Sequence, residues 1–150
     1  MSVYESPVTE AIILAAHAHD GQTDEHGAPY ILHPLAVMGM AQNDTERIVA
    51  VLHDVVEDTP TPLALLDILF GTEVMRAVEA LTKREHEDYH DFIQRAKANP
   101  IARQVKQYDI RHNLSRPPVK SPWKQNVLTE RYLLALDELG PDPVKLSVTC

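Results

Sequence analysis

Apolar residues recur every three or four positions along most of the chain, and this spacing constrains the fold more than any other feature. In the first such stretch Val8, Ala11, Ile12 and Ala15 share one helical face, and Pro7 lies near its start. No alternating polar and apolar run of useful length is present, so strands are not expected. The sequence therefore predicts an all-α fold, a single compact bundle of seven or so helices.

Prolines, glycines and capping residues mark the ends of the predicted helices. These helices are expected at residues 7–20, 34–40, 46–56, 63–70, 72–81, 88–98, 100–113 and 123–139. The polar stretch 21–30 is predicted to be a loop, and residues 141–150 are predicted to be a loosely held tail.

The chain has 150 residues, enough to bury one core without disulfides, and it has a single Cys. It lacks a basic and apolar leader and any run of ~18 apolar residues. We therefore expect one domain over residues 1–150, in the cytoplasm and without a membrane partner. The formal net charge of −8 argues against DNA or RNA as a partner and leaves a homo-oligomer open.

Charge is distributed unevenly along the sequence. Residues 1–75 contain twelve acids and one base, whereas residues 76–150 contain ten acids and thirteen bases. Between Arg103 and Lys124 six bases accompany a single acid, Asp109. An acidic half next to a basic stretch could bind a cation beside an anion. The alternative interpretation is that solvated helix faces simply carry charge unevenly.

The residues best suited to chemistry lie in the acidic half, at positions 53–58 (HDVVED). On the predicted helix His53 and Glu57 would be neighbours one turn apart, and so would Asp54 and Asp58. Four such groups in an apolar setting are costly to bury unless something pairs with them. They are candidates for metal binding or proton transfer. The His-Asp pairs at residues 19–20 and 90–91 are interpreted as structural or surface features.

Two further residues could complete a metal site. An octahedral divalent ion needs about six donors, some of them water. His33, at a predicted helix start, and Asp109 could join residues 53 and 54 if their helices pack together. The alternative makes His33 an ordinary helix-entry residue and Asp109 an ion-pair partner of Lys106 or Arg111. Spacing alone leaves both interpretations open.

Four short stretches form a combined sequence pattern in this order: residues 15–22 (AAHAHDGQ), 27–35 (GAPYILHPL), 51–59 (VLHDVVEDT) and 105–114 (VKQYDIRHNL). In combination they resemble the HD-superfamily hydrolase domain of RelA/SpoT-type proteins. The resemblance covers about residues 8–116 and implies an all-α HD-domain bundle. Residues 81–85 (LTKRE) and the brevity of the chain resemble a short stand-alone branch of the family, in which no synthetase domain is expected.

The resemblance also implies roles for individual residues. One divalent metal, typically Mn²⁺ with Fe, Co or Zn as alternatives, would be held by His33, His53, Asp54 and Asp109. The acidic pair Glu57 and Asp58 would position or deprotonate the attacking water. Residues around the substrate would be Asn113, Lys83 and Lys106, and Arg111 with Lys106 could offset charge on a diphosphate.

The implied activity is removal of the 3′-pyrophosphate from the alarmone (p)ppGpp, a small phosphorylated nucleotide. Two alternatives remain open. The same metal set could hydrolyse another small phosphate ester, such as a nucleotide monophosphate, or the chain could be a non-catalytic nucleotide-sensing domain. The presence of a water-activating acidic pair favours an enzyme.

One departure from the family bears on the substrate. Between Gln22 and Gly27 the alarmone hydrolases usually carry an Arg-Lys pair, whose Arg packs on the guanine base. This chain has Asp24 and Glu25 there, two anions that would repel a nearby tetraphosphate. The neighbouring His26 could stack on a base instead. The change leaves the metal residues intact and bears on specificity for the alarmone.

Overall fold

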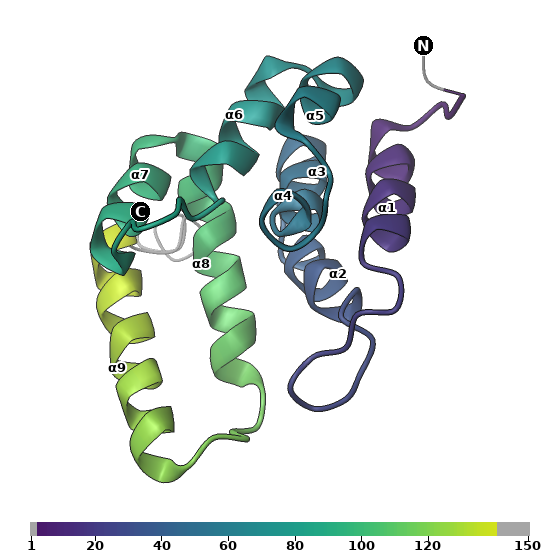
Figure 1. Ribbon diagram of the computed structural model, residues 1–150. Helices are drawn as coiled ribbons and strands as arrows, with labels where there is room; N and C mark the ends of the chain where they lie inside the picture. Colours follow the sequence, from purple (N-terminus) through teal and green to yellow (C-terminus); the bar gives the residue numbers. More distant parts are fainter. Residues whose placement is uncertain (1–2, 141–150) are drawn as a thin grey trace.

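The structure is a computed structural model that describes residues 3–140. Within that range the chain forms nine helices and no strand, apart from an isolated bridge between Thr23 and Pro29 (Figure 1). The helices are α1 Pro7–Ala18, α2 Leu32–Gly39, α3 Asp44–Leu52, α4 Val55–Asp58, α5 Leu63–Phe70, α6 Thr72–Ala80, α7 Tyr89–Ala98, α8 Pro100–Ser115 and α9 Pro122–Leu139. The predicted all-α fold is confirmed.

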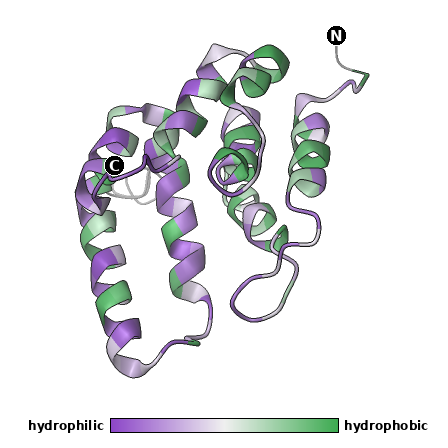
Figure 2. Ribbon diagram, viewed as in Figure 1, coloured by the Kyte–Doolittle hydropathy of each residue, from purple (hydrophilic) through white to green (hydrophobic). Residues whose placement is uncertain are grey.

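Helix α3 lies at the centre of the core. It packs against α1, α2, α6 and α8, and its residues 48–52 are all buried. Because this second half of the helix is buried on every side, it must be apolar all round, which explains the run of Ile, Val, Ala and Leu. Figure 2 shows hydrophobic residues gathered on α1, α2, α3 and α5, whereas α8 and α9 carry both kinds. Helix α8 reaches from this core to α7 and α9, so it joins the two sides of the bundle.

The predicted helix at residues 46–56 is broken in the structure. Helix α3 ends at Leu52 and α4 begins at Val55. The Ala50 carbonyl, which would accept the amide of residue 54 in a continuous helix, instead accepts His53 Nδ1 at 2.6 Å. The prediction that His53 and Glu57 share one helix is therefore wrong. The second predicted pair survives, because the N–H of Asp58 donates to the carbonyl of Asp54 at 3.0 Å.

The other predicted helices are present with ends shifted by a few residues, and residues 21–30 form the loop between α1 and α2. The predicted loose tail at 141–150 lies outside the described residues. Within residues 3–140 no helix is both long and apolar enough to cross a membrane. The assignment of residues 1–150 to one domain stays a prediction.

Arg95 on α7 holds the segment that joins α6 to α7. Its guanidinium donates to the two carboxylate oxygens of Glu87 at 2.6 and 2.9 Å and to two backbone carbonyls at 3.2 and 2.7 Å. The hydrogen bonds from Arg95 hold the pKa of Glu87 at about 2, below its ordinary value of 4.5. The same segment carries Lys83, whose backbone N–H donates to Glu57 at 2.6 Å.

We expect Glu87→Gln to lower the free energy of unfolding at pH 7 by about 1–3 kcal/mol, because charge-assisted hydrogen bonds to Arg95 are lost. A carboxylate whose pKa is depressed on folding stabilises above its unfolded pKa and loses this effect as pH falls through the folded value. The difference between the two proteins should therefore shrink as pH falls from 4.5 towards about 2. Urea unfolding at pH 7 and at acidic pH measures it. The exposed Glu85→Gln is the control, and equal losses in both variants would contradict the role of Glu87.

Candidate metal centre

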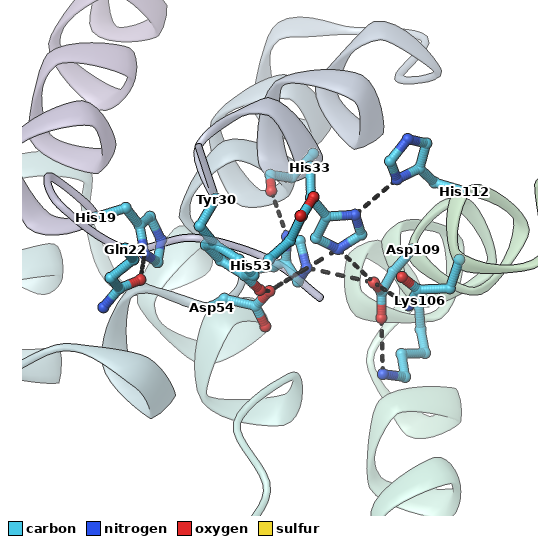
Figure 3. Close-up of polar contacts among 12 residues, drawn as sticks. His19, Gln22, Tyr30, His33, His53, Asp54, Lys106, Asp109 and His112 are labelled. Carbon is cyan, nitrogen blue, oxygen red and sulfur yellow. Dashed lines mark hydrogen bonds and ion pairs between the residues drawn. The ribbon is translucent and has the colours of Figure 1, made fainter. Parts of the chain in front are cut away.

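Three separate elements bring the four predicted metal ligands together (Figure 3). His33 lies in the first turn of α2, His53 and Asp54 lie in the break between α3 and α4, and Asp109 lies on α8. His33 Nε2 is 2.9 Å from Asp109 Oδ1 and 3.9 Å from Asp54 Oδ2. His53 Nε2 is 3.0 Å from Asp54 Oδ2 and 3.5 Å from Asp109 Oδ1. Donor atoms of His33, His53 and Asp109 all lie within 4.8 Å of one another and could hold one divalent ion, and Asp54 lies beside both histidines.

The break in the helix orients His53 as a ligand. A carbonyl can only accept, so the bond between Nδ1 and Ala50 places the ring proton on Nδ1 and leaves a lone pair on Nε2. That Nε2 is buried and has no hydrogen bond within residues 3–140, although the carboxylates of Asp54 and Asp109 face it. Burial alone would lower the pKa of His53, but these carboxylates raise it well above its ordinary value. The site therefore favours a cation at this atom, which fits a metal ion.

Asp109 is held as an anion by Lys106 of its own helix and by the two histidines. Burial alone would raise its pKa, but the charge of Lys106, the hydrogen bond from His33 and the nearby His53 hold the pKa well below its ordinary value. Lys106 Nζ donates to Asp109 Oδ2 at 2.8 Å and is itself largely buried beneath the Phe92 ring, 4.9 Å from its centroid. The opposite oxygen, Oδ1, faces the histidines. Asp109 is thus both an ion-pair partner of Lys106 and a member of the cluster.

His112 is a site residue that the sequence analysis missed. Its Nδ1 lies 2.7 Å from Nδ1 of His33, and the two rings stack with centroids 4.9 Å apart and planes 28° from parallel. Burial and the nearby charges of His33 and Arg116 lower the pKa of His112. A neutral His112 can accept the Nδ1 proton of His33, which would leave His33 Nε2 free to bind a metal. The sequence signal that could have identified His112 is its position three residues after Asp109 on α8, which places both on one helix face.

Tyr30 is a second missed residue. Its hydroxyl donates to Asp54 Oδ2, and burial together with the Asp54 charge raises its pKa above the ordinary range. The ring packs 5.0 Å from His19, which is buried and bonded through Nδ1 to Gln22 Oε1 at 2.8 Å. The structural interpretation of His19 is consistent with this geometry. Tyr30 lies three residues before His33 in the stretch 27–35, and this proximity could have identified it from the sequence.

The acidic pair Glu57 and Asp58 lies beside the cluster. Carboxylate oxygens of Asp54, Glu57 and Asp58 all lie within 4.8 Å of one another. Glu57 Oε1 accepts the backbone N–H of Lys83, so that carboxylate is fixed at one oxygen. Burial and the charges of Asp54 and Glu57 raise the pKa of Asp58 to about 6. Both carboxylates can therefore accept hydrogen bonds or protons next to the candidate metal ligands.

A pocket of about 320 Å³ opens beside the cluster and begins at Tyr30 and Asn113. Asn113 Nδ2 donates to Asp109 Oδ1 at 3.2 Å, so this predicted substrate residue touches both the cluster and the pocket. The remaining lining residues come from the loop 21–30 and from the segment between α8 and α9 onward: Thr23, Asp24, Glu25, His26, Arg116, Pro117, Val119, Lys120, Gln125, Leu128 and Tyr132.

The other predicted substrate residues lie apart from this pocket. Lys106 contacts Asp109 from within the bundle. Lys83 reaches Glu57 through its backbone, and its side chain is exposed. Arg111 Nη2 donates to Gln107 on its own helix at 3.4 Å. Their roles as substrate-binding residues stay predictions.

The fold and the site define a helical domain whose buried histidines and aspartates could hold a divalent metal next to a polar pocket. Residues 11–114 match the HD domain family, and the chain belongs to that family. A solved structure described as a metazoan ortholog of SpoT that hydrolyses ppGpp superposes with a TM-score of 0.73 at 22% identity. The match covers 93% of this chain and 96% of that one, and it shows a shared fold.

Curated relatives match over part of their length. The bifunctional (p)ppGpp synthase/hydrolase SpoT of Escherichia coli K12 is 40% identical over 86 residues, which is 55% of this chain and 12% of that protein. A guanosine-3′,5′-bis(diphosphate) 3′-pyrophosphohydrolase of Vibrio cholerae is 36% identical over 86 residues, with the same coverage. A GTP pyrophosphokinase of Myxococcus xanthus is 35% identical over 80 residues, 51% of this chain and 11% of that protein.

We expect His112→Ala to weaken Mn²⁺ binding about 10–100-fold, because residues that orient a metal-binding histidine contribute this much to metal affinity. Competition with a chelator of known affinity measures the change. His17→Ala, an exposed histidine at the end of α1, is the matched control and should bind Mn²⁺ as the unaltered protein does. An affinity that His112→Ala leaves unchanged would show that His112 does not support His33.

Proposed function

We propose that this chain is a metal-dependent phosphohydrolase that removes the 3′-pyrophosphate from guanosine-3′,5′-bis(diphosphate), ppGpp. The observation that carries the proposal is the buried cluster of His33, His53 and Asp109, joined by Asp54 and flanked by a carboxylate pair. Membership of the HD domain family and the names of the relatives from Escherichia coli and Vibrio cholerae support the same activity. Because the chain spans only 12% of those relatives, their substrate comes to it as a proposal.

We infer that one divalent ion would be held by His33, His53, Asp54 and Asp109. A mixed set of imidazoles and carboxylates suits Mn²⁺, and Fe, Co or Zn would also fit it. The chemistry that such an ion supplies, when bound, is to make water acidic enough to attack at neutral pH and to draw charge from a phosphoryl oxygen. Within the described part of the chain, the buried Nε2 of His53 has no hydrogen-bond partner, which supports a cation at these residues.

Glu57 and Asp58 would accept the proton of the attacking water. Glu57 keeps one carboxylate oxygen on the backbone of Lys83, which fixes its orientation and leaves the other oxygen for a water molecule. Attack at the phosphorus on the 3′ oxygen would break the ester bond, and the products would be pyrophosphate and GDP. The leaving 3′ oxygen would take up a proton as the bond breaks.

The remaining residues would bind or orient the substrate. Asn113 would contact the substrate where the pocket meets the cluster, since its amide lies at both. Lys106 would act through Asp109, which it fixes at 2.8 Å, and so would be a positioning residue. Lys83 keeps its proposed place around the substrate, and Arg111 keeps its proposed role of offsetting charge on the diphosphate. A cytoplasmic location and the absence of a nucleic-acid partner remain predictions.

We expect Glu57→Gln to retain metal and to lower ppGpp turnover about 10²–10⁴-fold, the range for loss of a general base. We expect Asp54→Ala to lose both metal and turnover, because a ligand and the partner of Tyr30 are removed. Elemental analysis gives the metal content, and release of pyrophosphate and GDP from ppGpp with Mn²⁺ gives the rate.

The exposed Glu85→Gln serves as the control for loss of a charge and should behave as the unaltered protein. Normal turnover by Glu57→Gln would remove Glu57 from the reaction. Binding of ppGpp without hydrolysis by the unaltered protein would favour a nucleotide-sensing domain. Release of phosphate from another nucleotide, with ppGpp untouched, would favour a different phosphate ester as the substrate.

A further inference from the structure

The pocket beside the metal centre is bridged by two charge pairs. The loop 21–30 supplies Asp24 and Glu25 on one wall, and the segment after α8 supplies Arg116 and Lys120 on the other. Asp24 Oδ2 lies 3.6 Å from Arg116 Nη1, and Lys120 Nζ donates to Glu25 Oε1. A third contact, between His26 Nε2 and the carbonyl of Pro117 at 2.8 Å, joins the same two segments.

The Asp24 carboxylate is built into the loop. Its Oδ1 accepts the backbone N–H groups of His26 at 2.8 Å and Ala28 at 3.0 Å, which directs Oδ2 towards Arg116. Burial alone would raise the pKa of Asp24, but these N–H groups hold it below its ordinary value. Asp24 is thus a fixed anion, and its side chain is 13% exposed. Glu25, at 60% exposed, is the more exposed of the two carboxylates.

The first charge pair is connected to the metal ligands through Asn113. Arg116 donates to the oxygen of Asn113, and Asn113 donates to Asp109, so Asn113 stands between the cluster and the first pair. A substrate with its scissile phosphate at the cluster would extend past Asn113 towards Arg116 and Lys120. Whatever it carries at that end would meet these two pairs.

Arginine and lysine bind phosphate well when their N–H groups are available. Here each cation already has a carboxylate partner, and the charges of the two pairs cancel. A phosphate group at this end would have to displace the carboxylates and would then lie beside two anions. An uncharged sugar or base would leave both pairs in place and could use their polar atoms for hydrogen bonds.

We propose that Asp24 and Glu25 determine specificity by occupying Arg116 and Lys120, so that the pocket favours a nucleotide without a second phosphate group at its far end. This rests on the proposed function, which places the scissile 3′-pyrophosphate at the cluster. Among guanosine 3′-diphosphates, the form with a free 5′-hydroxyl is then a better substrate than ppGpp, which carries a 5′-diphosphate.

The test is the double variant Asp24→Asn/Glu25→Gln, which removes both charges and keeps the Oδ1 acceptor of the loop. We expect kcat/KM for ppGpp to rise about tenfold, since each rim charge contributes a modest repulsion. We expect kcat/KM for the 5′-hydroxyl form to change less than about twofold. The control Glu73→Gln/Glu85→Gln removes two exposed charges elsewhere and should change neither value.

A binding measurement separates this inference from the proposed function. Calorimetric titration of both nucleotides into Glu57→Gln, with and without the double variant, gives the affinity ratio without turnover. A ratio that shifts towards ppGpp supports the inference even if the unaltered protein hydrolyses neither compound, which would overturn only the proposed function. The inference is overturned if the unaltered protein prefers ppGpp. It is also overturned if the double variant changes the affinity for both nucleotides equally, or if neither nucleotide binds.

Discussion

The hydrogen bond from His53 Nδ1 to the carbonyl of Ala50 is the interaction on which the site depends. It ends α3 inside the core, where a run of buried apolar residues would otherwise continue the helix. It also fixes the ring so that Nε2 faces Asp54 and Asp109. Because α3 packs against α2 and α8, the ligands on those helices meet at this break. The core therefore positions the chemistry.

Much of the fold follows from local signals, and much of the site does not. The caps at Asn43 and Asn99 and the glycine at residue 140 act over one turn, so the helix ends that they set were predictable. The break at His53 depends on a side chain competing with a backbone amide, which helical periodicity does not register. The bond from Lys83 to Glu57 joins residues 26 apart and depends on how α6 and α7 are placed.

The two interpretations that the sequence left open for Asp109 are compatible. Its Oδ2 pairs with Lys106, as the ion-pair alternative required, while Oδ1 faces both histidines, as the metal-site alternative required. If this buried carboxylate paired with only one of these groups, its other oxygen would lack a partner, or the buried Lys106 would lack a counter-charge. The excess of bases on α8 thus serves in part to keep one ligand ionised, with Lys106 doing so from the apolar side.

The acidic pair of the loop is also explained by residues far away in the sequence. Compared with the Arg-Lys pair usual in the alarmone hydrolases that this chain resembles, Asp24 and Glu25 look like a loss of substrate contacts. In the fold they face Arg116 and Lys120, so the inverted charges have partners on the opposite wall. Restoring cations to the loop alone would place like charges together and weaken the link between the two walls. The charge of the loop is therefore coupled to the segment after α8, and specificity at this pocket belongs to the two walls jointly.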